Sequence, residues 1–247
     1  MSGHSKWSTI KRQKGAADIK RGMTFTKLAN AITIATRLGN SGDVDANPRL
    51  RVAVDLARAV NMPKENVERA IDRGLGKLAG QTLEEVIYEG FGPGKVAFYI
   101  EAVTDNKMRT LQEMRNLFER SGGNLGGQGS TAYLFSQVGE IKIRTKGASI
   151  EDEILELIDL GAEDVEDYKD EENLQHYLVY VKSPELNTMS KNITQVGYEV
   201  ESAEIVYKPT MTVDINEPEL AKKILDFAGK LEEHDDIQKV YTNFEIV

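Results

Sequence analysis

The chain has 247 residues, which is enough for one to three domains with buried cores. Its 31 lysines and arginines and 40 aspartates and glutamates give a formal net charge of −9, a total that argues against a nucleic-acid partner. The absence of cysteine excludes disulfides, thiolate nucleophiles and cysteine metal sites, and no apolar run approaches the roughly 18–20 residues of a membrane helix. We therefore expect a globular cytoplasmic protein without a secretory signal or a membrane contact.

The total conceals an asymmetry along the chain. Residues 1–80 hold 15 lysines or arginines and 7 acidic residues, a net charge of +8. Residues 81–247 hold 16 lysines or arginines and 33 acidic residues, a net charge of −17. Opposite signs in two parts of one chain predict a basic contact module joined to an acidic body that keeps the protein soluble.

The first 80 residues predict three short helices. Apolar residues recur at helical three- and four-residue spacing from Phe25 to Leu38, from Leu50 to Val60 and from Val67 to Ile71. Asn47-Pro48 supplies an N-cap and a first-turn proline for the second helix. Because none of these helices can bury its apolar stripe alone, the segment predicts a three-helix bundle.

The rest of the chain predicts alternating strands and helices. Residues 137–207 give the order strand, helix, strand, strand, helix, strand, which is typical of a ferredoxin-like unit. Two flanking strand–helix–strand segments each supply half of a second such βαββαβ unit, with strands expected at 96–103, 131–135, 210–215 and 237–244.

The predicted fold class is therefore α+β, an N-terminal three-helix bundle followed by two ferredoxin-like βαββαβ domains, one inserted in the other. We expect a basic helical domain at residues 1–80, a discontinuous α+β domain at 81–136 plus 208–247, and an inserted α+β domain at 137–207.

No motif for catalysis, a metal or a cofactor is found, so we predict that the chain is not an enzyme. His4, His176 and His234 are far apart in the sequence, and we expect each to be a surface or half-buried residue. The acidic stretch 163–172 lacks the spacing of a calcium loop and predicts a solvated loop around a strand.

Two glycine-rich stretches, 90–95 and 122–129, lack the order of strand, loop and helix that phosphate- and dinucleotide-binding loops need. We expect the second stretch to cap a helix and to lead into a strand. Its five glycines exceed what a cap requires, so a role as a contact loop stays open.

The N-terminal segment carries the strongest functional signal, because Asp18 is the only acidic residue before position 38. Lysine and arginine at this density neutralise phosphates and release counterions, and the single tryptophan could stack on a base or ribose. The competing interpretation is a solvated basic arm with the tryptophan packed on the helices. The candidate nucleic-acid contacts are Lys6, Trp7, Lys11, Arg12, Lys14, Lys20, Arg21 and Lys27.

A set of short motifs follows in order along the chain: Gly3-His4-Ser5-Lys6-Trp7, Phe25-Thr26-Lys27-Leu28, Asn47-Pro48-Arg49-Leu50, Met62-Pro63-Lys64-Glu65-Asn66, Tyr88-Glu89-Gly90-Phe91-Gly92-Pro93, Thr104-Asp105-Asn106-Lys107-Met108-Arg109-Thr110 and Gly122-Gly123-Asn124-Leu125-Gly126. With these motifs the chain resembles the YebC/PmpR family over essentially its whole length, most loosely at 137–207. The resemblance implies a helical bundle with two α+β domains, one inserted in the other, and no catalytic residues. It also implies a role in gene expression, because bacterial members are described as probable transcriptional regulators that bind promoter DNA. Other members, including the mitochondrial translational activator of cytochrome oxidase subunit I, act on translation and associate with ribosomes.

We therefore predict a monomeric, non-enzymatic regulator that binds promoter DNA through its basic N-terminal domain. The alternative is a translation factor that binds ribosomal RNA on the ribosome and assists elongation. Charge does not separate the two, because both nucleic acids carry phosphates. Arg49, Arg51 and Arg58 of the second helix could read base edges, but no row of base-reading side chains is evident.

Overall fold

The computed structural model describes residues 17–78, 82–170 and 173–247, with side chains described from residue 24 onward. These residues form two compact units. One unit runs to Ser130 and includes Lys222–Val240, and the other contains Thr131–Ala221 and Tyr241–Val247. Within the described ranges, no helix has both the length and the apolar character that crossing a bilayer requires.

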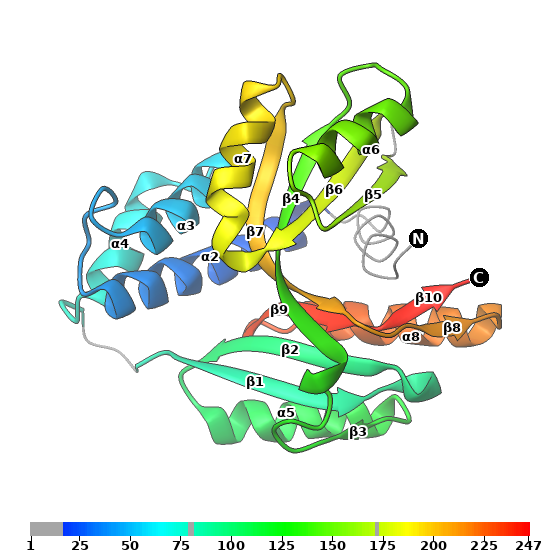
Figure 1. The fold of residues 1–247 in the computed structure, drawn as a ribbon. Coiled ribbons are helices and arrows are strands. Elements are labelled where there is room, and N and C mark those ends of the chain that lie inside the picture. Colours follow the sequence, from blue (N-terminus) through cyan, green and yellow to red (C-terminus); the bar gives the residue numbers. More distant parts are fainter. Residues whose placement is uncertain (1–16, 79–81, 171–172) are drawn as a thin grey trace. The chain divides into compact units, whose positions relative to one another are not determined.

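Three helices follow one another at the start of the described chain: α2 (Ala17–Gly39), α3 (Pro48–Ala59) and α4 (Lys64–Gly74) (Figure 1). Their buried side chains form one core that includes Ile32, Leu50 and Val67, so the predicted bundle is confirmed. The predicted stripes were too long at their ends, because Leu38 and Val60 are exposed.

Asn47 fixes the start of α3, as its sequence predicts. Its Oδ1 accepts a hydrogen bond from the Leu50 amide at 3.1 Å, and its Nδ2 donates to the Ala35 carbonyl at 2.9 Å. One side chain therefore caps α3 and ties it to α2.

A four-stranded sheet belongs to the same unit, with the order β3-β1-β2-β9. Its elements are β1 (Glu84–Phe91), β2 (Ala97–Thr104), β3 (Asn124–Leu125) and β9 (Ile237–Thr242), with a short 3₁₀ turn at Pro93–Lys95. Helix α5 (Lys107–Arg120) and helix α8 (Pro218–Glu232) contribute Phe118 and Phe227 to its core. Both rings pack edge-on against Phe98 of β2, so residues far apart in the sequence share one apolar core.

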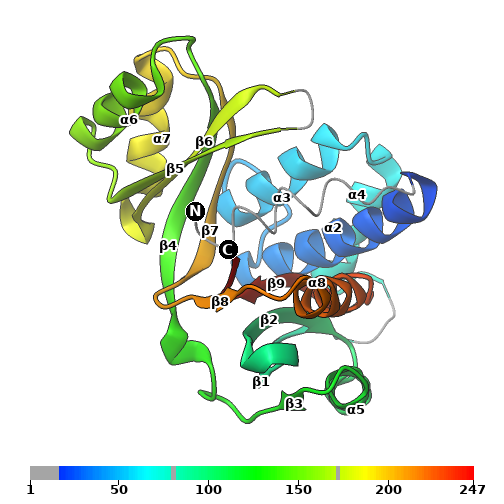
Figure 2. The ribbon, with the colours of Figure 1, turned by 90° about the vertical axis from the view of Figure 1, so that its right-hand side faces the viewer.

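The second unit contains the sheet β5-β6-β4-β7, in which each neighbouring pair is antiparallel. The chain order is β4 (Phe135–Arg144), α6 (Ile150–Asp159), β5 (Asp164–Lys169), β6 (Gln175–Lys182), a 3₁₀ turn (Ser183–Glu185), α7 (Leu186–Gln195) and β7 (Val200–Pro209). Both helices pack on one face of the sheet, through a core that includes Ile141, Leu157 and Ile193 (Figure 2). This is the predicted ferredoxin-like unit.

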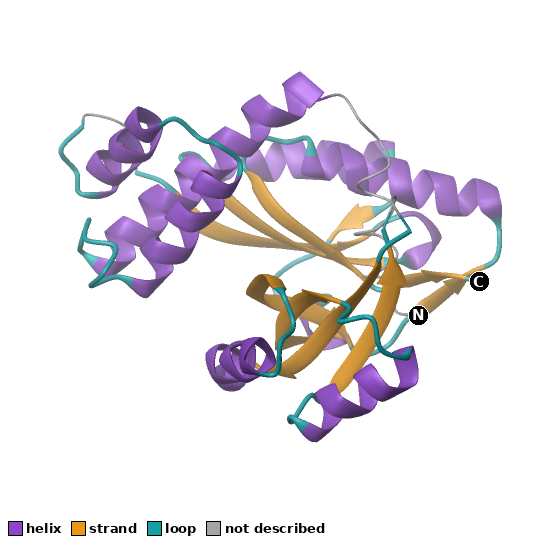
Figure 3. Cartoon of the chain, turned by 90° about the horizontal axis from the view of Figure 1, so that it is seen from above, coloured by secondary structure: helices purple, strands orange, loops and turns teal. Residues whose placement is uncertain are grey.

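The mixture of helices and antiparallel sheets confirms the α+β class (Figure 3). The strands of the first sheet differ from those expected. The predicted strand at 131–135 is wrong, because Ala132–Leu134 form a 3₁₀ turn and β4 begins at Phe135. From the predicted strand at 210–215, only β8 (Val213–Ile215) forms, and it pairs in parallel with β10 (Phe244–Ile246) in a small sheet of its own.

The position of β9 beside β2 bears on the domain organisation. The chain leaves the first sheet after β3, builds β4–β7, and returns through α8 to place β9 next to β2. The domain boundaries, a helical domain at 1–80, a discontinuous α+β domain at 81–136 plus 208–247 and an inserted domain at 137–207, stay a prediction.

Candidate nucleic-acid interface

Most of the candidate contacts lie at the very start of the chain. Lys6, Trp7, Lys11, Arg12 and Lys14 are outside the described residues. Lys20 and Arg21 belong to the backbone of α2, but their side chains are outside the described part. The proposed role of these residues therefore rests on sequence, charge and their connection to the first turns of α2.

Lys27 is the one candidate whose side chain is described, and it has a structural contact. Its half-buried ammonium group donates a hydrogen bond to the carbonyl of Glu232 at 2.6 Å. Glu232 is the last residue of α8, where carbonyl groups lack helical partners and the helix dipole favours a cation. Sequence reasoning missed this role, because no local pattern connects positions 27 and 232.

The three arginines of α3 are each held by neighbouring groups. Arg49 pairs with Glu85 and Arg58 pairs with Asp55. The Arg51 guanidinium donates to the carbonyl groups of Val44 and Asp45 at 3.0 and 2.8 Å. All three side chains remain largely exposed, so their role in reading base edges stays a prediction.

Two arginines of α4 add to the candidate surface. Arg69 and Arg73 stand one helical turn apart, both are exposed, and neither has an ion-pair partner among the described residues. Side chains four residues apart lie on the same helix face, so the two guanidinium groups can contact successive phosphates. Their i, i+4 spacing is visible in the sequence, but neither residue is among the predicted contacts, which lie in the N-terminal segment and the second helix.

The positive charge is concentrated outside the described side chains. Residues 1–23 hold six lysines or arginines and one acidic residue, a net charge of +5. Residues 24–80 hold nine lysines or arginines and six acidic residues, a net charge of +3. Five of these nine basic side chains form the ion pairs Arg49–Glu85, Arg51–Asp45, Arg58–Asp55, Lys64–Glu68 and Lys77–Asp72. Most basic side chains of residues 24–80 are therefore paired, and residues 1–23, which include the first turns of α2, carry the denser net positive charge.

The glycines of segment 122–129 mostly serve the fold. Gly122 ends α5 with a φ of +75°, and a Cβ at Gly123 would lie 2.5 Å from the Phe91 carbonyl oxygen. The Gly129 amide, at a φ of +83°, donates to the buried carboxylate of Glu89 at 2.7 Å. Gly127 is different, because a Cβ there would meet nothing within 4 Å. The expected helix cap is confirmed, and Gly127 is the glycine that the fold does not explain.

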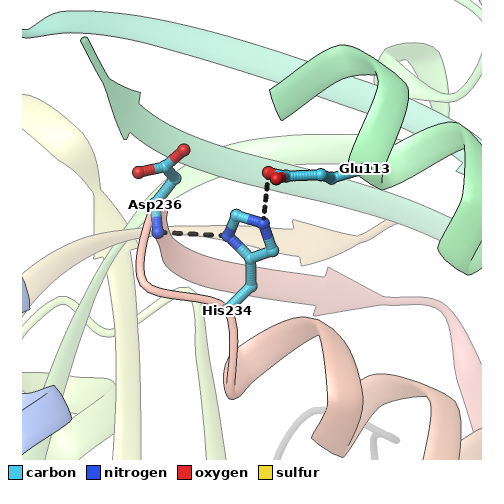
Figure 4. Close-up of side chains that lie close together, drawn as sticks. All are labelled: Glu113, His234 and Asp236. Atoms are coloured by element: carbon cyan, nitrogen blue, oxygen red, sulfur yellow. Dashed lines mark hydrogen bonds and ion pairs between the residues drawn. The ribbon is translucent and has the colours of Figure 1, made fainter. Parts of the chain in front are cut away.

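Three residues near the end of α8 form the cluster that most resembles a metal site (Figure 4). Glu113, His234 and Asp236 offer ligand atoms within 4.8 Å of one another. The His234 Nε2 lies 3.0 Å from a Glu113 carboxylate oxygen, and its Nδ1 accepts from the Asp236 amide at 3.1 Å. An accepting Nδ1 leaves the proton on Nε2, which then donates to Glu113. His234 is half-buried, as expected, and both ring nitrogens are engaged.

The Asp236 carboxylate is also occupied by protein donors. It accepts hydrogen bonds from Thr110 at 2.6 Å and from Arg109 at 2.9 Å. Burial alone would raise the pKa of Asp236, but these hydrogen bonds and the charge of Arg109 outweigh it and hold the pKa below its usual value. The cluster therefore acts as a polar connection between α5 and the turn before β9.

We expect the Asp236→Asn substitution to lower the free energy of unfolding at pH 7 by about 1.5–3 kcal/mol, because it removes a charged acceptor of two hydrogen bonds. A carboxylate with a lowered pKa stabilises the fold above its unfolded value of about 3.9, and this stability is lost as the pH falls through the lower folded value. The difference between wild type and variant in urea denaturation should therefore shrink below about pH 4. Asp235→Asn, at an exposed neighbour, is the control and should change stability little.

His176 departs from its expected exposure. It is fully buried, stacks on the Tyr168 ring with centroids 5.3 Å apart, and places Nε2 2.9 Å from an Asp170 carboxylate oxygen. The neighbouring acidic stretch contains the expected strand, because Asp164–Lys169 form β5, and Glu166 of this strand pairs with Lys208 at 3.0 Å. Charge pairing across the sheet allows acidic residues to form a strand there.

Comparison with known proteins places the chain in a family. Residues 5–77 match the family model of the TACO1/YebC protein N-terminal domain, and residues 83–244 match that of the TACO1/YebC second and third domain. A probable transcriptional regulatory protein of Thermotoga maritima is 47% identical, with 100% of this chain and 94% of the relative covered. A protein of the same name from Chloroflexus aurantiacus is 48% identical, with coverage of 100% and 96%.

A solved structure agrees with these matches. The crystal structure of a conserved hypothetical protein from Aquifex aeolicus superimposes with a TM-score of 0.82 at 43% identity, covering 93% of this chain and 92% of that one. Both parts of the sequence match one family in order, and the two relatives align over 94% and 96% of their length. The chain therefore belongs to the TACO1/YebC family.

Proposed function

We propose that this chain is a non-enzymatic regulator of gene expression that binds DNA through its basic N-terminal domain. The names of its relatives, probable transcriptional regulatory proteins, support a regulator with a nucleic-acid partner. The observation that carries the proposal is the net charge of +5 on residues 1–23, in a chain whose residues 81–247 carry −17. Phosphate is attracted to the first segment and repelled by the second, so the charge distribution supports binding through the first segment.

The contacts proposed are with phosphates more than with bases. The exposed α3 arginines contact Glu85, Asp55 and loop carbonyl groups, whereas Arg69 and Arg73 of α4, also exposed, have no ion-pair partner among the described residues. Phosphate contacts position a protein on nucleic acid without reading its sequence. We therefore infer that affinity comes from the segment Lys6–Arg21 with Arg69 and Arg73, and that Trp7 adds stacking.

The net charge of +5 on residues 1–23 also supports a second candidate function, a translation factor that binds ribosomal RNA. Phosphate-directed contacts fit a folded RNA as well as a duplex, and a tryptophan stacks most readily on unpaired bases, which RNA loops provide. The two candidates differ in partner and not in the protein surface used.

The test is a salt titration of binding to two probes of similar length, a duplex DNA of about 30 base pairs and a ribosomal-RNA hairpin. If the six basic residues of segment 1–23 and Arg69 and Arg73 each contact a phosphate, log K should fall with log salt with a slope of about −7 on the duplex. Tighter binding to the duplex supports the DNA regulator, and tighter binding to the hairpin supports the translation factor. Binding to neither probe, or a slope near zero on both, contradicts the proposal.

A further inference from the structure

The outer edge of β1 is open over most of its length. β3 pairs only with Gly90 and Phe91, the last residues of β1. The Gly126 amide donates to the Glu89 carbonyl at 2.8 Å, so Glu89 directs its backbone groups to this edge. Backbone groups alternate in direction along a strand, so Ile87 and Glu85 direct theirs to the same edge. Among the described residues, the amide and carbonyl groups of Ile87 and Glu85 find no hydrogen-bond partner there.

A groove follows this edge. It is lined by β1 residues 86–89, by Lys107, Met108 and Leu111 of α5, and by loop residues 126–128. Met108 is 74% exposed and Ile87 is 40% exposed, so apolar surface faces solvent beside the unpaired backbone groups. Gly127 keeps the loop end of the groove free of a side chain. Three of the sequence motifs meet here, those that begin at Tyr88, Thr104 and Gly122.

The charges at this edge are compensated. Acidic side chains on an edge strand usually discourage the addition of another strand. Here Glu84 pairs with Lys107 at 2.5 Å, and Glu85 pairs with Arg49. With both carboxylates neutralised by neighbours, the edge carries little net charge to repel an incoming chain.

We propose that this groove binds an extended peptide segment of a partner protein, which adds as a strand to β1 at Glu85–Ile87 and places an apolar side chain against Met108 and Leu111. The pairing of β3 supports this occupant, because β3 already occupies the same edge antiparallel to β1 and leaves it at Gly126. The incoming strand continues the ladder where β3 ends. A nucleic acid has no backbone of matching repeat, whereas an extended peptide supplies alternating donors and acceptors. This surface lies beyond the residues proposed for nucleic-acid contact.

The experiment starts from a phage library of random 12-residue peptides selected on the full-length protein. A selected peptide is synthesised in two further forms. In one form every second backbone amide is N-methylated, and in the other the remaining backbone amides are N-methylated. Strand addition uses only one set of peptide amides, so one methylated form should lose at least tenfold in affinity by calorimetry and the other should keep it. Equal affinity of both forms, or no enriched peptide, overturns the proposal.

Variants of the groove provide a second measurement. Met108→Glu and Gly127→Leu should each lower the affinity for the selected peptide at least tenfold. Both sites have space for the new side chain. Met211→Glu, at a methionine that is 68% exposed in the other unit, is the matched control and should leave peptide affinity unchanged. Unchanged peptide affinity in both groove variants overturns the proposal. Nucleic-acid affinity is measured on the same samples, so a failure of the proposed function shows separately from a failure of the groove.

Discussion

Replacing Lys6, Lys11, Arg12 and Lys14 with glutamine is expected to weaken nucleic-acid binding by roughly 10²–10³-fold at moderate salt, the largest functional effect of any change considered. Each lysine or arginine on a phosphate releases counterions when it binds. Loss of four such contacts should therefore make the salt slope on duplex DNA less steep by about 3–4. The measurement is fluorescence anisotropy of the full-length protein at several salt concentrations.

The control variant removes the same number of positive charges outside the N-terminal segment. Lys182, Lys191, Lys222 and Lys223 are exposed lysines outside the helical domain, and their replacement by glutamine lowers the net charge equally. If binding depends on local contacts, this variant should keep the wild-type slope. Equal losses in both variants would mean that total charge, and not the N-terminal segment, sets the affinity.

The Phe227→Ala substitution is expected to lower the free energy of unfolding by about 3–5 kcal/mol, the largest effect on stability. The Phe227 ring is 1% exposed and lies 4.9 Å, between centroids, from both Phe98 and Phe118. Its removal leaves a cavity and breaks two edge-on aromatic contacts. Urea denaturation measures the change, and Met108→Ala at an exposed position should stay within about 0.5 kcal/mol of wild type.

Hydrogen exchange of Phe227→Ala also tests the discontinuous arrangement. Because α8 returns after the inserted strands to complete the core around Phe98, amides of β1 and β2 should exchange faster in the variant. Amides of β4 and β6, which belong to the other unit, should keep their protection. A loss of protection confined to β4 and β6 would contradict the assignment of α8 to the first sheet.

The sequence predicted the elements whose apolar period is regular. The spacing from Leu50 to Ala57 places every third or fourth side chain in the core of the bundle, and β4–β7 follow the expected ferredoxin-like order. β1 was missed because its buried residues include Glu89 and Gly90, which are rare in strands. Glu89 is tolerated there because the distant Gly129 amide meets its carboxylate.

The candidate site was predictable only in part. Density of charge pointed to the N-terminal segment, but the partners of Lys27 and Arg49 come from residues 232 and 85. Contacts between residues so far apart follow from the tertiary fold and leave no local pattern. The open edge of β1 could not be predicted for the same reason. It is open because β3 pairs with only two residues of β1, Gly90 and Phe91.

The most direct test of the nucleic-acid role is crosslinking in cells, followed by sequencing of the bound nucleic acid and mapping of the crosslinked peptides. The account predicts promoter DNA crosslinked to the segment Lys6–Arg21, with the signal lost when Lys6, Lys11, Arg12 and Lys14 are replaced by glutamine. Ribosomal RNA crosslinked to the same segment would identify the second candidate function instead. Crosslinks confined to residues 81–247, the part of the chain with a net negative charge, would contradict the account. Crosslinks that are unchanged in the substituted protein would contradict it as well.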